Sequence, residues 1–456
     1  MIKYNEEIET KALAWFKELL KFDTSNPPGN EKAAIDHIAG IVKSFGIEPK
    51  IIYKSSPARP NLYASLEGKK AGPKLLLSSH VDVVPIEDAT SWSFDPFSAS
   101  EFEDCIWSRG TLDMKFKTAF DLALLSLAAE QKDSFAGSLE LVCVCDEEVG
   151  SEHGSKFLMD QHRDLFKATH VLNELGGFNL NLAGTELILI QAGEKHSMHM
   201  RIHCLGQSTH ACVPPKETAI KLLSEVMLAF STEFLGFQLC PITNAFFDTI
   251  LNTGNPITQT LVPLLKDPNS VEQTLETLPD AIVRTELKSM LCHTVVPTRI
   301  GGGFKINVIP EAAWADFDCR IVPTVNPQEF RELVKKFISL RFPNDADNIQ
   351  IEFMDEELGY EIDMQDEIFQ SISKEIEKFW SDKPTSPKSA PMLLPAGSDS
   401  RNYANAGIVP IGFAPLYFPP DFPGFTLAHA ANERVPISAF LEGLKAYINT
   451  VSSLLS

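Results

Sequence analysis

The sequence predicts an α/β protein in which a mostly parallel sheet is flanked by helices, with a smaller α+β domain inserted into it. Two observations predict the larger domain: short apolar runs end in polar residues, and these runs alternate with segments of helical periodicity. The inserted domain is predicted by a change of pattern after residue 193, where strands with one polar face begin. At 456 residues, the chain is also longer than one compact core usually supports.

The amino-terminal part opens with two predicted helices, 6–21 and 31–45, which are separated by a turn rich in Pro, Gly and Asn. An apolar run at 75–85 then predicts a buried strand that delivers His80 and Asp82 near its carboxyl end. Two residues apart on a strand, these side chains share a face. His80 can therefore offer one ring nitrogen to a metal while Asp82 accepts a hydrogen bond from the other or orients the ring through a neighbouring residue. Taken alone, the pair is better explained by a surface histidine beside a charge.

Four later segments place further metal-binding side chains in loops. Asp113 lies in a Gly-containing turn before a long apolar helix, and the buried strand that follows ends in the acids Asp146–Glu148. Glu174 follows a short apolar strand, and His429 lies in a loop near the end of the chain. Strand ends that repeatedly present His, Asp and Glu at one edge of a parallel sheet are where such sheets build ligand sites. Two histidines and three carboxylates are also the ligand set of a paired zinc centre in which one carboxylate bridges.

These segments, in this order, resemble the zinc-dependent amidohydrolase superfamily that includes carboxypeptidase S, aminoacylase, acetylornithine deacetylase and succinyl-diaminopimelate desuccinylase. The resemblance spans about residues 22–435 and implies a zinc-exopeptidase-like catalytic domain. It also implies two Zn²⁺ ions per chain, although carboxylate-rich sites also take Co²⁺ or Mn²⁺. The implied ligands are Asp113 as the bridge, His80 and Glu174 at one ion, and Glu148 and His429 at the other.

The resemblance further implies that Glu147 is the general base and that Asp82 supports His80. This chain departs from the family pattern at three places. Leu175 and Ala430 follow ligands where relatives often have glycine, and Phe116-Lys117 also replaces a glycine. None of these departures removes a ligand, so they bear on the shape of the pocket more than on metal binding.

The middle of the chain predicts the inserted domain. Its elements follow the order strand, helix, strand, strand, helix, strand, which is typical of a small two-layer sandwich. We therefore predict a discontinuous catalytic domain at 1–193 and 355–456 and an insert at 194–354. A stretch at 235–291, rich in Pro and Thr, elaborates the insert. The resemblance implies that the insert is a lid or dimerisation domain.

Five further residues match family motifs for substrate binding. By resemblance, His210 donates to the developing oxyanion, within one chain or across a dimer interface, while Asn307 and Arg320 hold a substrate carboxylate. An oxyanion needs a donor already in place, and a guanidinium pairs with a carboxylate through two bonds. The loop at Gly397 and Ser398 resembles a carboxylate-binding signature, but a simple tight turn explains it as well. Without the metal motifs, each of these residues would have an ordinary structural explanation.

Composition bounds the partners and the compartment. The net charge of −21 argues against nucleic acid or an anionic membrane as partner. Neither a secretory signal nor an apolar run of membrane-spanning length is visible, so we expect a cytoplasmic protein. The 8 cysteines show no Cys-x-x-Cys spacing, which favours reduced core residues over disulfides or metal ligands.

The predicted function is hydrolysis of an amide bond next to a free carboxylate, as in a carboxypeptidase S-like metallopeptidase. The alternative is an N-acyl-amino-acid deacylase, and the two differ only in what lies on the acyl side. The expected substrate is thus a small peptide or an N-acyl amino acid, and a homodimer through the insert is compatible with the resemblance. A catalytically silent scaffold is a third reading, against which the full set of ligand residues argues.

Overall fold

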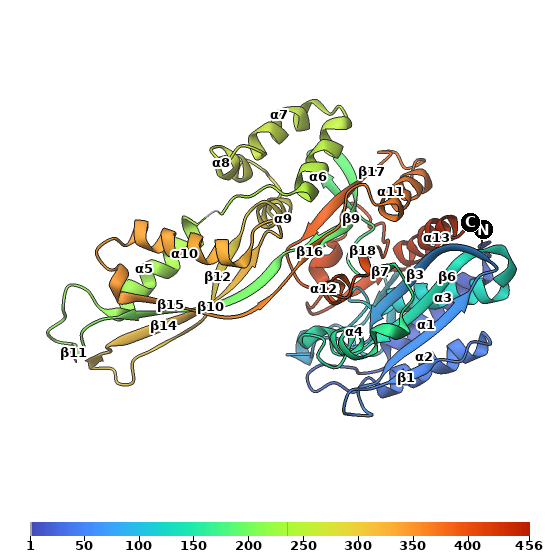
Figure 1. Ribbon diagram of the computed structural model, residues 1–456, viewed down its shortest axis with the longest axis horizontal. Helices are drawn as coiled ribbons and strands as arrows, with labels where there is room; N and C mark the ends of the chain where they lie inside the picture. The colour runs from blue at the N-terminus through green and yellow to red at the C-terminus, as the bar shows by residue number, and fades with distance from the viewer. Residues whose placement is uncertain (1, 235) are drawn as a thin grey trace. The chain divides into compact units, whose positions relative to one another are not determined.

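In the computed structural model, which describes residues 2–234 and 236–456, the chain forms two compact units (Figure 1). The first unit contains the residues up to Ala192 together with Ile362–Met392 and Ser398–Ser456. The second contains Gly193–Glu361 and Leu393–Gly397. Residues 1 and 235, which begin the predicted ranges 1–193 and 235–291, lie outside the described residues.

The main sheet has ten strands in the order β1-β2-β6-β3-β7-β18-β9-β16, with β8 and β17 also paired to β9. The strands are β1 (Lys50–Ile52), β2 (Asn61–Glu67), β3 (Lys70–His80), β6 (Ala136–Val144), β7 (His170–Asn173), β8 (Phe178–Leu182), β9 (Thr185–Glu194), β16 (Tyr360–Glu361), β17 (Lys388–Leu394) and β18 (Val409–Gly412).

The α/β class is confirmed, but the sheet is mixed rather than mostly parallel. The central pairs β3-β6, β3-β7 and β7-β18 are parallel, whereas β1-β2, β2-β6 and β8-β9 are antiparallel. The β8-β9 connection shows the reason. Only Ala183 and Gly184 join the two strands, both with positive φ (50° and 84°), and so short a turn can link only antiparallel neighbours.

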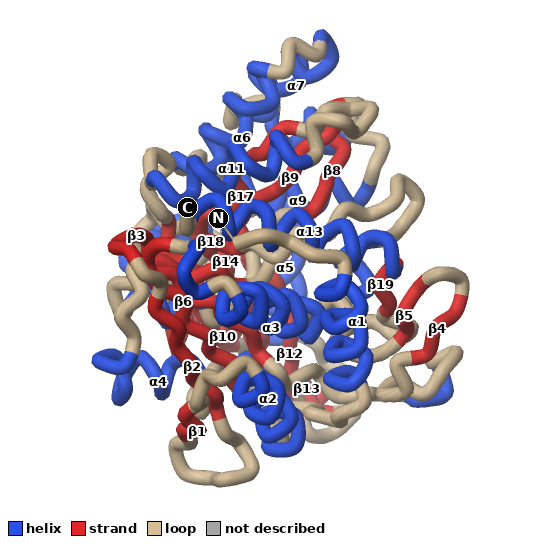
Figure 2. The backbone as a smooth tube through the Cα atoms, turned by 90° about the vertical axis from the view of Figure 1, so that its right-hand side faces the viewer, coloured by secondary structure: helices blue, strands red, loops and turns tan. Residues whose placement is uncertain are grey.

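Helices cover both faces of the central strands. On β3, the Ser79 hydroxyl bonds the Thr118 hydroxyl of α3 (Lys115–Glu130) at 2.9 Å, while the Ser78 hydroxyl bonds the Tyr403 hydroxyl of α12 (Ser400–Asn405) at 2.8 Å. Because successive residues of a strand point to opposite faces, α3 and α12 lie on opposite sides. The helices α1 (Glu7–Leu20) and α13 (Ile437–Leu454) pack against α3, and Figure 2 shows α1 beside it.

The remaining helices of this unit are short or lie at its periphery: α2 (Lys32–Ser44), α4 (Ser155–His162) and α11 (Glu367–Phe379). A small three-stranded sheet, β19-β5-β4, joins β4 (Ser100–Phe102), β5 (Cys105–Trp107) and β19 (Arg434–Pro436). Cys143 and Cys145 are buried at the end of β6, and none of the eight cysteines forms a disulfide, but Cys212 is exposed and Cys105 is half-buried rather than in the core. In the part of the chain that the structure describes, no helix has the length and apolar character needed to cross a bilayer.

The longer strands and the helices α5 and α10 of the second unit follow the order strand, helix, strand, strand, helix, strand, and β15 ends at Glu357, beyond the predicted limit of the insert at 354. Its sheet runs β12-β14-β10-β15, with every pair antiparallel, and the helices α5 and α10 share one buried core with it. The elements are β10 (His196–Leu205), β11 (Thr209–His210), α5 (Ala219–Thr232), β12 (Thr294–Gly302), β13 (Val308–Ile309), β14 (Ala312–Ile321), α10 (Pro327–Arg341) and β15 (Ile349–Glu357).

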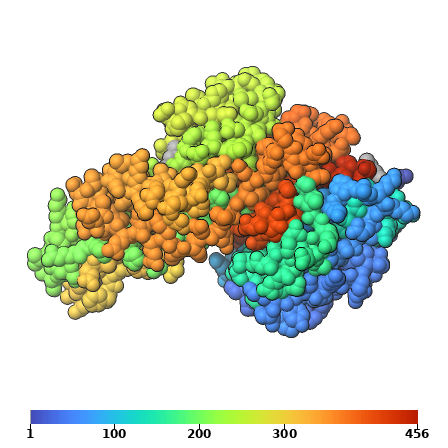
Figure 3. All heavy atoms as spheres, in the orientation of Figure 1, coloured from blue at the N-terminus to red at the C-terminus, as the bar shows by residue number. Residues whose placement is uncertain are grey.

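The predicted elaboration consists of four helices: α6 (Pro241–Asn252), α7 (Pro256–Leu265), α8 (Val271–Glu276) and α9 (Ala281–Leu291). Prolines begin α6 and α7, where their missing N–H costs nothing. Side chains of this yellow-green segment are at the surface in Figure 3.

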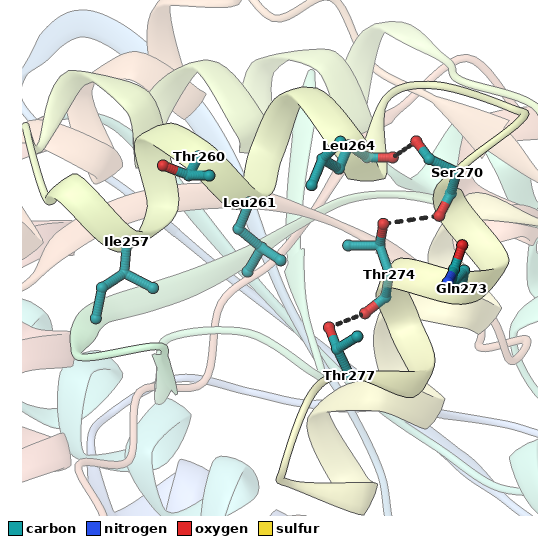
Figure 4. Close-up of a pocket in the computed structure, with 8 residues that line it drawn as sticks. All are labelled: Ile257, Thr260, Leu261, Leu264, Ser270, Gln273, Thr274 and Thr277. Carbon is teal, nitrogen blue, oxygen red and sulfur yellow. Dashed lines mark hydrogen bonds between the residues drawn. The ribbon is translucent and has the colours of Figure 1, made fainter.

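Between α7 and α8 lies a pocket of about 430 Å³ (Figure 4). The hydroxyls of Ser270, Thr274 and Thr277 that line it are each bonded to a nearby main-chain carbonyl at 2.6–2.8 Å. None of the predicted site residues lines this pocket.

Candidate metal centre

Three neighbouring parallel strands end in predicted site residues. His80 is the last residue of β3, Glu147 and Glu148 lie in the short helix η3 (Glu147–Val149) after β6, and Glu174 follows β7. The strands pair in the order β6-β3-β7, with His80 opposite the last residue of β6. Their carboxyl ends therefore present one histidine and three carboxylates at a single edge of the sheet.

Asp113 and His429 reach the same place from loops. Asp113 lies between β5 and α3, and His429 lies between the short helix η6 (Gly424–Leu427) and β19. Because β5 and β19 pair with each other, they bring the two loops together. Asp113 Oδ1 lies 2.9 Å from His80 Nε2, and Asp113 Oδ2 lies 3.0 Å from His429 Nε2. One carboxylate thus faces two histidines, with one oxygen turned to each.

The other two carboxylates complete two groups around Asp113. Glu174 Oε2 lies 3.4 Å from His80 Nε2, and Glu148 Oε2 lies 3.4 Å from His429 Nε2. This grouping is the one that the family resemblance implies. Whether these five residues bind metal remains a prediction.

The donor set fits metal ions in spacing and in chemistry. Nitrogen and oxygen ligands at zinc-bonding distance in a tetrahedral arrangement lie about 3.3 Å apart, close to the 3.4 Å observed twice. The oxygen Glu148 Oε1 is buried and has no hydrogen-bond partner among the described residues, so it is available to a cation. Neutral imidazole and carboxylate together suit zinc, cobalt or manganese.

Electrostatics also favours a cation here. Desolvation and then the charge of Glu174 raise the pKa of Glu147 well above its usual range, and burial raises the pKa of Glu174 to about 7. Hydrogen bonds to Asp113 and Glu148 raise the pKa of His429 to about 10. Crowded acids and histidines of this kind are what divalent ions stabilise.

Asp82 supports the His80 ring with its main chain rather than with its carboxylate. The His80 ring is held by the main-chain carbonyl of Asp82, 2.9 Å from Nδ1, whereas the Asp82 carboxylate is 3.7 Å away. That carboxylate instead accepts the main-chain N–H groups of Glu147 (3.2 Å) and Glu148 (3.1 Å) and the side-chain amide of Asn26 (2.9 Å). Asp82 therefore fixes the His80 ring with its backbone and the η3 turn with its side chain.

The sequence reasoning missed several residues that support the site. Asn26 donates to Asp82 and Asp146, and the buried Asp399 accepts bonds from the hydroxyls of Ser151 and Ser155. Burial raises the pKa of Asp399 to about 6. Arg109 and Glu433 form a buried ion pair across the two loops that carry Asp113 and His429. Asn26 and Asp399 lie in segments that the sequence analysis had identified as loops, but no sequence pattern indicates which residues they hydrogen-bond.

Three of the predicted substrate residues, His210, Asn307 and Arg320, lie in the second unit and form two groups. His210 and Asn307 are neighbours, because β11 pairs with β13 and Asn307 accepts the N–H of Ala211 at 3.1 Å. Cys212 N donates to His210 Nδ1 at 3.2 Å, which places the proton of the neutral ring on Nε2 and makes that atom a donor. Asn307 Oδ1 is buried without a hydrogen-bond partner among the described residues.

Arg320 lies elsewhere and has a partner. Its guanidinium makes two bonds to the Asp318 carboxylate, at 2.8 and 2.9 Å. Arg320 is near the end of β14, whereas Asn307, which is next to His210 through the β11-β13 pair, precedes the first residue of that strand. Eight residues of strand separate Ala312 from Arg320, or roughly 26 Å.

Gly397 and Ser398 fall at a boundary between segments. Gly397 is assigned to the second unit and Ser398 to the first. The Ser398 hydroxyl accepts the N–H of Ser400 at 3.1 Å, at the start of α12. This contact is typical of a tight turn, which was the other explanation of the loop. Carboxylate binding by Gly397 and Ser398 remains a prediction.

The chain is similar to known proteins over nearly its whole length. The model of the Peptidase family M20/M25/M40 matches residues 76–453. Aminoacylase-1 of Dictyostelium discoideum is 25% identical over 463 aligned residues, which cover 98% of each chain.

Solved structures share the fold. An M20 family metallo-carboxypeptidase, Sso-CP2 of Sulfolobus solfataricus, superposes with a TM-score of 0.67 at 18% identity, covering 97% of this chain and 99% of that one. The YXEP protein of Bacillus subtilis, described as a dinuclear metal binding peptidase from the M20 family, gives a TM-score of 0.60 at 12% identity, with 98% and 99% covered.

Proposed function

The chain belongs to the Peptidase family M20/M25/M40 and hydrolyses amide bonds. We propose that it deacylates N-acyl amino acids at a dinuclear zinc centre. The observation that carries the proposal is the Asp113 carboxylate, whose two oxygens face His80 and His429 at 2.9 and 3.0 Å. The sequence alone ranked a carboxypeptidase first. Similarity to an aminoacylase over 98% of both chains favours the deacylase, while the fold shared with a metallo-carboxypeptidase keeps peptide cleavage as the second candidate.

The proposed centre holds two ions. His80 and Glu174 would hold one, Glu148 and His429 the other, and Asp113 would bridge them. Zinc bound there supplies a Lewis acid and makes water acidic enough to act as a nucleophile near neutral pH. The dinuclear description of a solved protein with the same fold supports two ions rather than one.

Glu147 is the proposed general base. It lies beside Glu148 in η3, its main-chain N–H binds Asp82, and its carboxylate lies within 4.8 Å of donor atoms of His80 and Glu174. It would take a proton from the attacking water and then deliver that proton to the departing nitrogen. The His210 Nε2–H would donate to the oxygen of the amide carbonyl as negative charge develops there.

We also propose that two copies of the chain build one site. His210 and Asn307 lie at the β11-β13 pair, next to the start of β14, and Arg320 lies roughly 26 Å along that strand. A small N-acyl amino acid does not span this distance, so one substrate can meet Arg320 of one copy and His210 of another. The side chains of Phe304 and Ile306 between β12 and β13 are 86% and 102% exposed, and they offer an apolar contact to the second copy.

The test is a substrate panel on purified protein, before and after chelation and zinc reconstitution. It compares N-acetyl amino acids, their carboxamide analogues that lack the carboxylate, and dipeptides, with release of free amino acid as the readout. We expect zinc-dependent cleavage of the N-acetyl amino acids and at least 100-fold slower cleavage of the carboxamides. Faster cleavage of dipeptides would favour the carboxypeptidase. No turnover by zinc-loaded protein would favour the silent scaffold.

A further inference from the structure

Arg109 and Glu433 connect the two loops that carry Asp113 and His429. Arg109 precedes Asp113 by four residues, and Glu433 follows His429 by four. Both side chains are buried, and Arg109 Nη1 lies 2.8 Å from Glu433 Oε2. The chain positions of the two residues differ by 324, so this contact exists only in the folded protein.

The Glu433 carboxylate binds the Asp113 loop along its backbone. Oε2 accepts the N–H of Gly110 at 3.1 Å, and Oε1 accepts those of Leu112 at 2.7 Å and Asp113 at 3.3 Å. Each oxygen therefore holds main-chain donors on the segment that ends at Asp113. A carboxylate with this many N–H partners defines the path of a loop that has no helix or strand of its own.

Arg109 binds the His429 loop in the reverse direction. Its Nη1 donates to the carbonyl oxygen of Ala430 and its Nη2 donates to that of His429, both at 3.1 Å. A residue on the Asp113 loop thus holds the backbone at His429, while a residue on the His429 loop holds the backbone at Asp113. We call this reciprocal pair, Arg109 and Glu433, the loop clamp.

His429 is the less protected of the two predicted ligands on these loops. The His429 side chain is 53% exposed and its backbone has φ of 64°, a conformation that non-glycine residues rarely adopt without help. By contrast, His80 is 1% exposed and ends a central strand. Packing therefore fixes the His80 side of the centre, and hydrogen bonds from the clamp fix the other side.

We infer that the loop clamp sets the separation of Asp113 and His429 and thereby the metal affinity of the centre. Arg109 and Glu433 are positioning residues that touch neither substrate nor metal. The inference rests on the proposed metal-binding function and adds to it the device that holds the bridging carboxylate against the loop histidine. Loss of partners that orient metal ligands typically costs 10- to 100-fold in metal affinity.

Two variants break the clamp in different ways. Glu433→Gln keeps the size of the side chain but replaces one carboxylate oxygen with an amide donor, which cannot accept the N–H groups on that side. Arg109→Lys keeps the charge but cannot reach Glu433 and both carbonyls with a planar fork. Glu140→Gln is the matched control, because Glu140 is also buried and accepts a main-chain N–H, that of Lys167 at 2.8 Å, far in sequence from both loops.

The experiment measures Zn²⁺ affinity by competition with a chromophoric chelator and records the visible absorption of Co²⁺-loaded protein, whose bands report the coordination geometry. Thermal melting of the metal-free variants checks that each is folded. We expect both clamp variants to bind Zn²⁺ 10- to 100-fold more weakly and to shift the Co²⁺ bands, with Glu140→Gln within threefold of wild type. Should Glu433→Gln not fold, Arg109→Lys alone decides.

The outcomes separate the two proposals. Wild-type protein that binds no Zn²⁺ would remove the proposed function. Wild-type protein that binds Zn²⁺, together with a folded clamp variant of unchanged affinity and unchanged Co²⁺ bands, would remove the clamp alone. An equal loss of affinity in Glu140→Gln would also overturn the inference, because it would assign the effect to general destabilisation.

Discussion

Replacing Glu147 with glutamine tests the proposed proton transfer. Glutamine has nearly the same shape but no basic oxygen, and the main-chain N–H of residue 147 still binds Asp82 at 3.2 Å. The four short contacts among the predicted ligands do not involve Glu147, although its carboxylate lies within 4.8 Å of donor atoms of His80 and Glu174. We therefore expect Glu147→Gln to keep its metals and its melting temperature while losing turnover.

The expected loss of kcat follows from the role of Glu147 as general base. Proton transfer by a positioned side chain contributes about 10²- to 10⁴-fold to rate, or about 2.7–5.5 kcal/mol at about 1.36 kcal/mol per factor of ten. We accordingly expect a loss near the middle of the range, about 10³-fold in kcat, or about 4 kcal/mol.

The assay compares kcat for an N-acetyl amino acid in wild type, Glu147→Gln and Glu152→Gln, with metal content measured on each. Glu152 is the matched control, because it lies in the same region but is exposed and pairs only with Lys54 and Lys156. Its variant should stay within twofold of wild type. Turnover of Glu147→Gln within tenfold of wild type, at full metal content, would refute the assignment of the general base.

Three further predictions concern stability and are checked by urea unfolding. Burial lowers the pKa of Lys117 and raises that of Asp121 to about 6, although the two are paired at 2.6 Å. We therefore expect Asp121→Leu to lower the free energy of unfolding by about 3–5 kcal/mol, and the double variant Asp121→Leu/Lys117→Met to recover most of that loss. A double variant no more stable than Asp121→Leu would contradict this. Gly176→Ala would place a Cβ 1.9 Å from a main-chain oxygen and should lower the free energy of unfolding by about 1–3 kcal/mol or more. In the control Gly40→Ala the new Cβ meets nothing within 4 Å, so this helix variant should be more stable than wild type by about 0.5–1 kcal/mol. Burial lowers the pKa of Lys195 to about 7. Between about pH 7 and 10 Lys195 is therefore protonated in the unfolded chain but not in the folded one, so the free energy of unfolding should rise with pH. An equal rise in Lys195→Met would refute this.

The parts of the site that the sequence predicts are those carried by local pattern. His80, Glu148 and Glu174 could be found because each follows an apolar run, and parallel strands bring such ends together. Asp318 could also have been found, because residues two apart on a strand share a face, and this relation puts it beside Arg320. The antiparallel flanks of the sheet depend on turns such as Ala183-Gly184, which the sequence analysis did not single out.

Long-range contacts escaped the sequence for a physical reason. Glu433 accepts the N–H of Leu112 from 321 positions away, and nothing in the local pattern around either residue marks that pairing. The Asp82 carboxylate likewise binds the turn at Glu147, 65 positions later. Hydrophobic periodicity indicates which face of a helix or strand is buried. These hydrogen bonds depend instead on which distant loops the fold brings into contact.

The position of the second unit within the chain has a consequence for biosynthesis. Five of the six residues proposed for the ligands and the base lie before Gly193, while His429 is encoded after Glu361. A ribosome therefore finishes the whole insert before it reaches the last histidine, and β5 must wait equally long for its partner β19. In the proposed enzyme the nascent chain cannot close its centre until the insert has been synthesised, so the complete centre can bind metal only after translation of Gly193–Glu361.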